Sequence, residues 1–218
     1  MNLAHRFARH SAALVLLLPL CACALANIAN EPAPQLFTLT AAHPAPAAPS
    51  AADKAHVVVD EFSAPAVVDS ARIVQQSGAN ELKYYADVRW ADRAPRLIQN
   101  LMVETMENSD RFASVATRGA DLRGEYELAG DIRQFAVDAT NPSALMVKIE
   151  LYARLVLESE RSIVATRSFS VYVPVSGGGI SAIVAAYDTG HHQALEGIAV
   201  WADESARLGA AKSPLPRS

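Results

Sequence analysis

The sequence predicts an α+β domain, with an antiparallel or mixed sheet of about six or seven strands and two amphipathic helices packed on one face. Three stretches of the 218 residues predict it. Residues 145–158 alternate apolar and polar side chains, which is typical of a strand in a sheet with one wet face. Residues 97–106 and 183–201 instead repeat apolar side chains every three or four positions, which is typical of helices that bury one stripe.

Short strands are expected in the first half of the chain. Residues 35–40 alternate enough for a first strand, and residues 57–62 have the β-branched content of a second. Residues 71–76 and 81–88 predict a hairpin, because the turn-forming residues 77–80 separate them.

A helix is predicted to follow Trp90. Asp92 is a candidate N-cap, and Pro95 suits the first turn. The helix is expected to end near Ser109, before a short edge strand over residues 111–116. Its apolar stripe consists of Leu97, Ile98, Leu101, Met102 and Met106.

Two long strands and their neighbours form the expected centre of the domain. Apolar residues change parity between Ile132 and Phe135, which predicts a bulge near Arg133. Residues 163–173 are expected to form a hairpin with the strand over 145–158. The final helix, over about 180–207, has an apolar face and a weak point at Gly190. That face consists of Ile183, Val184, Tyr187, Leu195, Ile198 and Trp201.

The first residues have the order of a secretory signal. Arg6 and Arg9 precede the uncharged run 11–20, which is too short to span a membrane and is followed by small residues. Leu20-Cys21-Ala22-Cys23 resembles a lipobox, so residues 1–22 are expected to be removed and Cys23 to carry the lipid. Cleavage after Ala26, at an A-x-A site, is the alternative and would release a soluble periplasmic protein.

Composition limits what the remaining chain can be. Hydrophobic residues make up 51% of the sequence, but 42 of them are alanines. Many alanines fall in the expected tether, residues 23–34, and in an Ala/Pro-rich insertion loop, residues 41–55, neither of which is expected to contribute to a core. We expect one domain over 35–206 and a disordered tail over 207–218. The net charge of −4 argues against nucleic-acid binding.

The sequence contains no recognisable catalytic motif. His191 and His192 are adjacent on a predicted helix and diverge by about 100°, and no third His or acid is expected at ligand spacing, so we expect solvated helix residues with His191 partly packed. Gly177–Gly179 lacks the Lys-Ser/Thr of a phosphate-binding loop. No catalytic residue, cofactor or metal is therefore expected.

Several segments resemble the ABC-type transport auxiliary lipoprotein family, of the paraquat-inducible protein C type. They are Val57–Pro65, Leu82–Trp90, Pro95–Ile98, Phe112–Val115, Leu128–Phe135 and Glu196–Trp201. The resemblance covers about residues 35–206, and its most specific part is Tyr84-Tyr85 with Arg89-Trp90 before a helix that starts with proline. The insertion at 41–55 and Cys21 within the lipobox depart from the family pattern.

The resemblance implies a non-enzymatic lipoprotein on the periplasmic face of the outer membrane. Such a protein works with an ABC permease and ATPase and with a periplasmic substrate-binding protein of the mammalian-cell-entry type, which together move lipid between the two membranes. Cys23 is the functional position that transfers from the family. A homo-oligomer is also compatible with this expectation.

Two alternatives for the function stay open. One is an envelope scaffold or an activator of cell-wall synthesis, and the other is a small periplasmic hydrolase. Tyr84, Tyr85, Arg89 and Trp90 are either a partner-facing surface or a segment whose alternate side chains pack under the first helix; we favour the packed arrangement. Trp201 is expected in the core.

Overall fold

The structure, a computed structural model, describes residues 33–45, 54–119 and 124–212. The chain divides into two compact units, residues 1–34 and residues 35–218. The signal peptide, Cys23 and almost all of the predicted tether lie outside the described residues.

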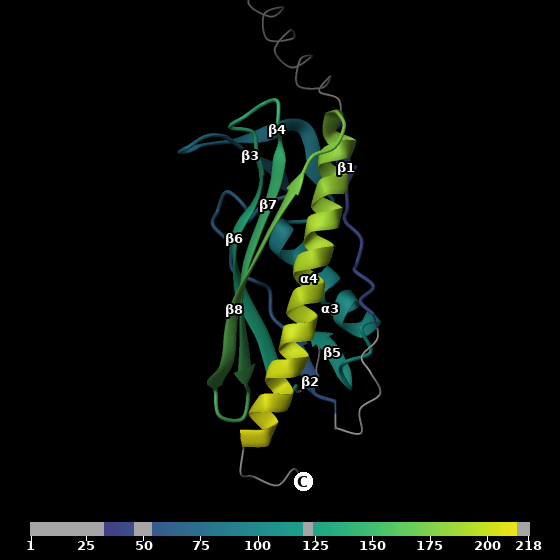
Figure 1. Cartoon of the computed structure of the whole chain (residues 1–218), viewed down its shortest axis with the longest axis vertical. Coiled ribbons are helices and arrows are strands. Elements are labelled where there is room, and N and C mark those ends of the chain that lie inside the picture. Colours follow the sequence, from purple (N-terminus) through teal and green to yellow (C-terminus); the bar gives the residue numbers. More distant parts are fainter. Residues whose placement is uncertain (1–32, 46–53, 120–123, 213–218) are drawn as a thin grey trace, which may run out of the picture. The chain divides into compact units, whose positions relative to one another are not determined.

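The second unit is an α+β domain built on one eight-stranded mixed sheet (Figure 1). The prediction of the fold class is confirmed, with one strand more than the upper expectation. The strands are β1 (Gln35–Phe37), β2 (His56–Val59), β3 (Arg72–Gly78), β4 (Glu81–Trp90), β5 (Ser114–Thr117), β6 (Tyr126–Asp138), β7 (Met146–Leu157) and β8 (Ser162–Pro174). The helices are α3 (Ala94–Asn108) and α4 (Gly179–Lys212).

Strand β6 joins the parts of the sheet. Along one edge it pairs antiparallel with β7 over almost its whole length. Along its other edge, its first residues pair parallel with β2 and its last residues pair parallel with β3. The register with β7 shifts between Ile132 and Gln134, so the bulge predicted near Arg133 is confirmed.

The bulge keeps the apolar side chains of β6 on one face. Leu128 and Ile132 before it and Phe135 and Val137 after it are all buried. Without the extra residue, the parity change would send Phe135 and Val137 to the wet face. The strand thereby contributes to a single core along its 13 residues.

The hairpin of β7 and β8 agrees with the predicted period-two pattern. Val147, Ile149, Leu151, Ala153 and Leu155 are fully buried, and the residues between them are half-buried on the other face. That wet face carries ion pairs between neighbouring strands, which are Arg154–Asp131 and Lys148–Asp138. Because β8 pairs only with β7, it forms an edge of the described sheet.

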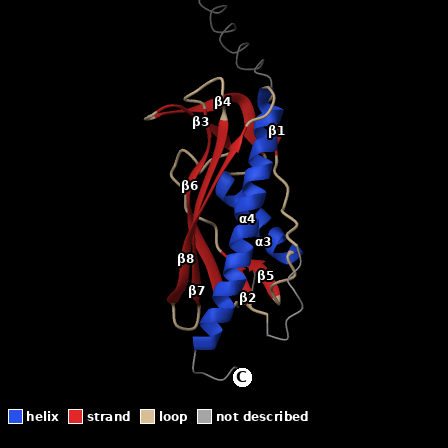
Figure 2. Ribbon diagram, in the orientation of Figure 1, coloured by secondary structure: helices blue, strands red, loops and turns tan. Residues whose placement is uncertain are grey.

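Both helices cover the apolar face of the sheet (Figure 2). Helix α3 buries the five predicted stripe residues, and its N-cap is Arg93 rather than Asp92, with no side-chain cap. Proline in its first turn removes one of the N–H groups that the helix could not satisfy internally. Helix α4 continues to Lys212, so residues 207–212 of the predicted tail are helical.

Glycines of α4 lie where the helix approaches the sheet. A Cβ at Gly190 would lie 3.1 Å from Val173 Cγ2 and 3.2 Å from Ile149 Cδ1, and one at Gly197 would contact the Phe169 ring at 3.3 Å. Gly190 costs about 1 kcal/mol of helix propensity relative to alanine. The missing side chain allows α4 to pack closely on β7 and β8. Gly190, the predicted weak point of the helix, is therefore a packing contact.

The beginning of the Ala/Pro-rich segment belongs to the core, which corrects the expectation that it contributes nothing. We call residues 38–45 the strap, because they connect β1 to both helices. Leu39, Ala41, Ala42 and Pro44 of the strap are buried. The Ala42 N–H donates to Thr105 Oγ1 of α3 at 3.1 Å, and Asn108 Nδ2 of α3 donates to the Ala42 carbonyl at 3.2 Å.

Gly130 on β6 provides a test of the core. A Cβ there would fall within 2.5 Å of Phe62 Cε2 and even closer to the Tyr152 carbonyl oxygen. We expect Gly130→Ala to lower the free energy of unfolding by about 2 kcal/mol or more, as overpacking does. Chemical denaturation measures the change.

Gly178 is the matched control for this substitution. A Cβ at Gly178 meets no atom within 4 Å. Gly178→Ala should therefore leave the stability within about 0.5 kcal/mol of the parent, as surface substitutions do. Equal effects of the two substitutions would contradict the packing that we describe around Gly130.

Candidate functional site

The four residues singled out on β4 divide between core and surface. Trp90 is 1% exposed, Tyr85 is half-buried, and Tyr84 and Arg89 are exposed. Burial raises the pKa of the Tyr85 hydroxyl. Asp87, with φ of 56°, interrupts the alternation: Tyr85 is half-buried before it, and Val88 and Trp90 are buried after it. The sequence pattern did not reveal this irregularity.

Trp90 packs in an aromatic cluster at the centre of the domain. Its ring centroid lies 5.9 Å from that of Phe135 on β6 and 5.0 Å from that of Tyr187 on α4. Trp90 therefore packs against the last helix, α4, as well as against the sheet. Trp201 of α4 is also buried, against Phe169 of β8, as the sequence predicted.

The exposed part of the β3–β4 hairpin forms a surface on the side of the sheet opposite the helices. The Arg72 guanidinium stacks on the Tyr84 ring at 4.9 Å, and the Tyr84 hydroxyl donates to the Val67 carbonyl at 3.3 Å. Leu82 beside them is 51% exposed. A groove of about 430 Å³ adjoins Leu82 and reaches Val67. We call Leu82, Tyr84 and Arg89 the hairpin surface.

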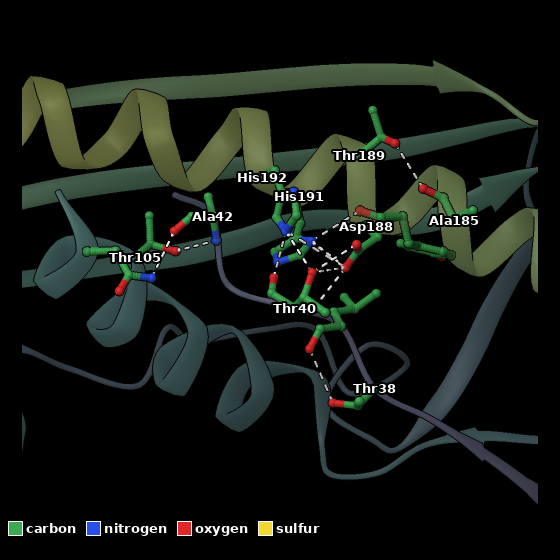
Figure 3. A network of polar contacts seen from close by, with 12 residues as sticks. Thr38, Thr40, Ala42, Thr105, Ala185, Asp188, Thr189, His191 and His192 are labelled. Carbon is green, nitrogen blue, oxygen red and sulfur yellow. Dashed lines mark hydrogen bonds and ion pairs between the residues drawn. The ribbon is translucent and has the colours of Figure 1, made fainter. Parts of the chain in front are cut away.

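A second candidate site lies where the strap crosses α4 (Figure 3). The Thr40 N–H donates to Asp188 Oδ1 at 2.8 Å, and the Thr40 hydroxyl donates to Asp188 Oδ2 at 2.9 Å. His192 Nε2 lies 2.8 Å from the Thr40 carbonyl oxygen and 3.0 Å from Thr40 Oγ1. We call Thr40, Asp188, His191 and His192 the polar junction.

His191 is the buried member of the polar junction. It is 1% exposed, its Nδ1 lies 3.3 Å from the Tyr187 carbonyl oxygen, and its Nε2 has no hydrogen-bond partner among the described residues. Burial, together with the neighbouring His192, lowers the pKa of His191 to about 4. The imidazole is therefore neutral at physiological pH.

The structure corrects two expectations about these histidines. His191 is fully buried, where the sequence predicts a partly packed residue. Asp188 lies three and four positions before the histidines, so an acid at ligand spacing does exist. On a helix these spacings place side chains on one face, and the ligand atoms of the three residues lie within 4.8 Å of one another.

The polar junction does not have the arrangement of a hydrolytic triad. In a triad, the carboxylate binds one ring nitrogen of the histidine while the other nitrogen accepts the proton of the nucleophile. Here Thr40 and Asp188 both approach Nε2 of His192, and Asp188 binds the Thr40 hydroxyl directly. The geometry supports a structural contact or a ligand set rather than an activated threonine.

The described residues contain no helix of the length and apolarity that crossing a bilayer requires.

Gly177 and Gly179 have positive φ angles of 99° and 78° and lead into α4. Nothing lies within 4 Å of a Cβ placed at Gly179.

Comparison with known proteins identifies the family. Residues 37–199 match the family of ABC-type transport auxiliary lipoprotein components, which includes all the elements from β2 to most of α4. The chain belongs to this family, as the sequence resemblance predicted. The family is described as a transport auxiliary component, which favours a role other than catalysis.

Individual relatives add the fold and little about function. Protein XCC0632 from Xanthomonas campestris is 27% identical, with a TM-score of 0.72 over 82% of this chain and 100% of that one. The crystal structure of an uncharacterized protein has a TM-score of 0.54 at 14% identity, over 84% of this chain and 100% of that one.

Among curated proteins, the uncharacterized protein bll6063 of Bradyrhizobium diazoefficiens is 33% identical over 105 residues. The match covers 48% of this chain and 28% of that protein, so this chain spans little more than a quarter of the relative's length.

The aromatic cluster gives a prediction that separates a structural tryptophan from a surface one. Trp90→Ala should lower the free energy of unfolding by about 3–5 kcal/mol, because it leaves a cavity between Phe135 and Tyr187. Tyr187→Phe should leave it unchanged or raise it by about 1 kcal/mol, since the Tyr187 hydroxyl is buried without a partner among the described residues. Urea denaturation measures both, and a small effect of Trp90→Ala would place that side chain outside the core.

Proposed function

We propose that this protein is a lipoprotein anchored to the periplasmic face of the outer membrane, where it serves a lipid transport system without catalysing a reaction. Its partners are an ABC permease and ATPase and a periplasmic substrate-binding protein of the mammalian-cell-entry type. The observation that carries the proposal is the family match over residues 37–199.

The proposed anchor is a lipid on Cys23. Leu20 and Ala22 precede this cysteine as in a lipobox, and Ala24 follows it. A mature lipoprotein carries several acyl chains, which give stable attachment where one chain gives marginal attachment. Folding of residues 35–212 requires no cysteine, because both cysteines of the chain lie before residue 24.

The proposed contact with a partner is the hairpin surface. Tyr84 and Leu82 are large, exposed side chains beside a groove, and Arg89 adds a cation. Tyrosine and arginine are enriched where proteins bind one another. Tyr85 and Trp90, the other two residues of this segment, pack towards the core and so hold the strand that carries the hairpin surface.

The anchor is tested by replacing Cys23. Cys23→Ser should abolish the incorporation of labelled palmitate and move the protein from the membrane fraction to the periplasmic fraction. Cys21→Ser is the matched control, because Leu20 before Cys21 is too large for a lipobox, and it should retain the label. Membrane retention of the Cys23→Ser protein, unlabelled, would refute the anchor.

The partner contact is tested by affinity purification from cells that express the transport system. Tyr84→Ala combined with Arg89→Ala should reduce co-purification of the substrate-binding protein at least tenfold, because two contact residues are removed from an exposed surface. Tyr172→Ala is the control, since Tyr172 is a 50% exposed tyrosine on the edge strand β8.

Two outcomes of this purification argue against the proposal. If the unmodified protein captures no transporter component, the envelope scaffold is the better assignment. If Tyr172→Ala reduces capture as much as the hairpin substitutions, the contact is not on the hairpin surface.

A further inference from the structure

The polar junction brings together side chains that share the chemistry of metal ligands. Asp188 lies three and four positions before His191 and His192 on α4, and one ligand atom from each of the three residues lies within 4.8 Å of the others. Asp188 Oδ1 is 3.9 Å from His191 Nδ1 and 3.9 Å from His192 Nε2. Imidazole nitrogen and carboxylate oxygen are typical ligands of Zn²⁺ in proteins.

The junction is rich in atoms that accept hydrogen bonds or donate electron pairs. His191 Nδ1 faces the Tyr187 carbonyl oxygen and Asp188 Oδ1. His192 Nε2 faces the Thr40 carbonyl oxygen, Thr40 Oγ1 and Asp188 Oδ1. Each nitrogen is therefore surrounded by oxygens, and an electropositive group, either a proton or a metal ion, is required between them.

The burial of His191 provides a second, independent observation. Its ring is 1% exposed, and Nε2 has no hydrogen-bond partner among the described residues. Buried polar atoms are normally satisfied, and the unsatisfied Nε2 belongs to the ring whose Nδ1 faces Asp188. Metal binding at Nδ1 would replace its contact with the Tyr187 carbonyl oxygen and place the ring proton on Nε2.

We propose that Asp188, His191 and His192 bind a divalent transition-metal ion, with Zn²⁺ as the cognate ion, and that the Thr40 carbonyl oxygen completes the site. In a tetrahedral zinc site the ligands lie about 2.0–2.2 Å from the metal, so that two ligand atoms are about 3.4 Å apart. The two separations of 3.9 Å from Asp188 need a contraction of about 0.5 Å, and the three ligand atoms, which lie within 4.8 Å of one another, must all move closer together. Side-chain rotation supplies it.

The site is open to an ion from solvent. Metal binding at His192 Nε2 would replace the contact of this nitrogen with Thr40 and requires Nε2 to be unprotonated. The side chains of Asp188 and His192 are 31% and 33% exposed, which gives an ion access from solvent.

The proposed metal would join two segments that are distant in the sequence. Thr40 belongs to the strap, and the three side-chain ligands belong to α4, about 150 residues later. A bound ion would therefore add a strong link to the hydrogen bonds that already hold the strap against the helix. This role is independent of the transport partners proposed above.

The experiment uses the full-length chain, purified in detergent without a histidine tag. Zn²⁺ binding is measured by competition with a chromophoric chelator, and Co²⁺ serves as a spectroscopic substitute whose visible absorption reports four-coordinate geometry. We expect one equivalent of metal per chain and a rise in melting temperature with added Zn²⁺, because a ligand that binds only the native state stabilises it.

Two conservative substitutions remove ligands while keeping the fold. Asp188→Asn keeps an oxygen that accepts the Thr40 N–H, and His192→Gln replaces a partly exposed side chain. Each should weaken Zn²⁺ binding on the order of 100-fold and abolish the Co²⁺ spectrum, since even outer-shell changes cost 10–100-fold in affinity. Circular dichroism of the metal-free variants verifies that they are folded.

Two further substitutions are matched controls. Thr40→Val removes the hydroxyl but keeps the carbonyl, and should retain the metal. His56→Ala removes an exposed histidine from β2, outside the junction, and should also retain it. Absence of saturable binding by the parent, or binding that Asp188→Asn and His192→Gln leave unchanged, would overturn the proposal and leave a hydrogen-bonded junction only.

Discussion

The pairing of β6 on both of its edges is the constraint on which the rest of the domain depends. On one side it carries the β7–β8 hairpin, and on the other it holds two separate groups of strands, β2 with β5 and β3 with β4 and β1. These two groups meet through β6 in the described sheet. The bulge after Ile132 allows one strand to serve both groups while its apolar residues stay on the helical face. Helix α4 then covers the hairpin, and its glycines permit the close approach.

The elements of this fold that are local in the sequence could be predicted. The period-two pattern of β7, the parity change in β6 and the stripe of α3 each reflect side chains that face one environment, and such patterns are visible in a single sequence. The parallel pairings of β1 with β4 and of β2 with β5 and β6 could not be predicted, because they depend on contacts between distant segments.

The candidate sites show the same division. Trp201 in the core followed from the helical stripe, whereas the position of Trp90 depended on an irregular strand. The spacing of Asp188 to His191 and His192 is visible in the sequence, but the prediction did not include Asp188 as a third ligand. Thr40 could not have been assigned to these residues, because 148 residues separate it from Asp188. The alanines of the strap were predicted to belong to a loop outside the core. Ala41 and Ala42 are buried instead, and their small side chains suit a segment that packs closely against the helices.

The strap also determines how a pull on the N-terminal end is transmitted. Strand β1 pairs with β4 over three residues, so force along the chain first loads a short ladder of hydrogen bonds. Beyond that ladder, Thr40 is attached to α4 and Ala42 to α3. Rupture of the pairing of β1 with β4 would therefore release only a few residues before the contacts of Thr40 and Ala42 with the helices bear the force. The N-terminal segment is thus attached at two successive places. The pairing of β1 with β4 can break while the contacts of the strap with the helices and the hydrophobic core stay intact.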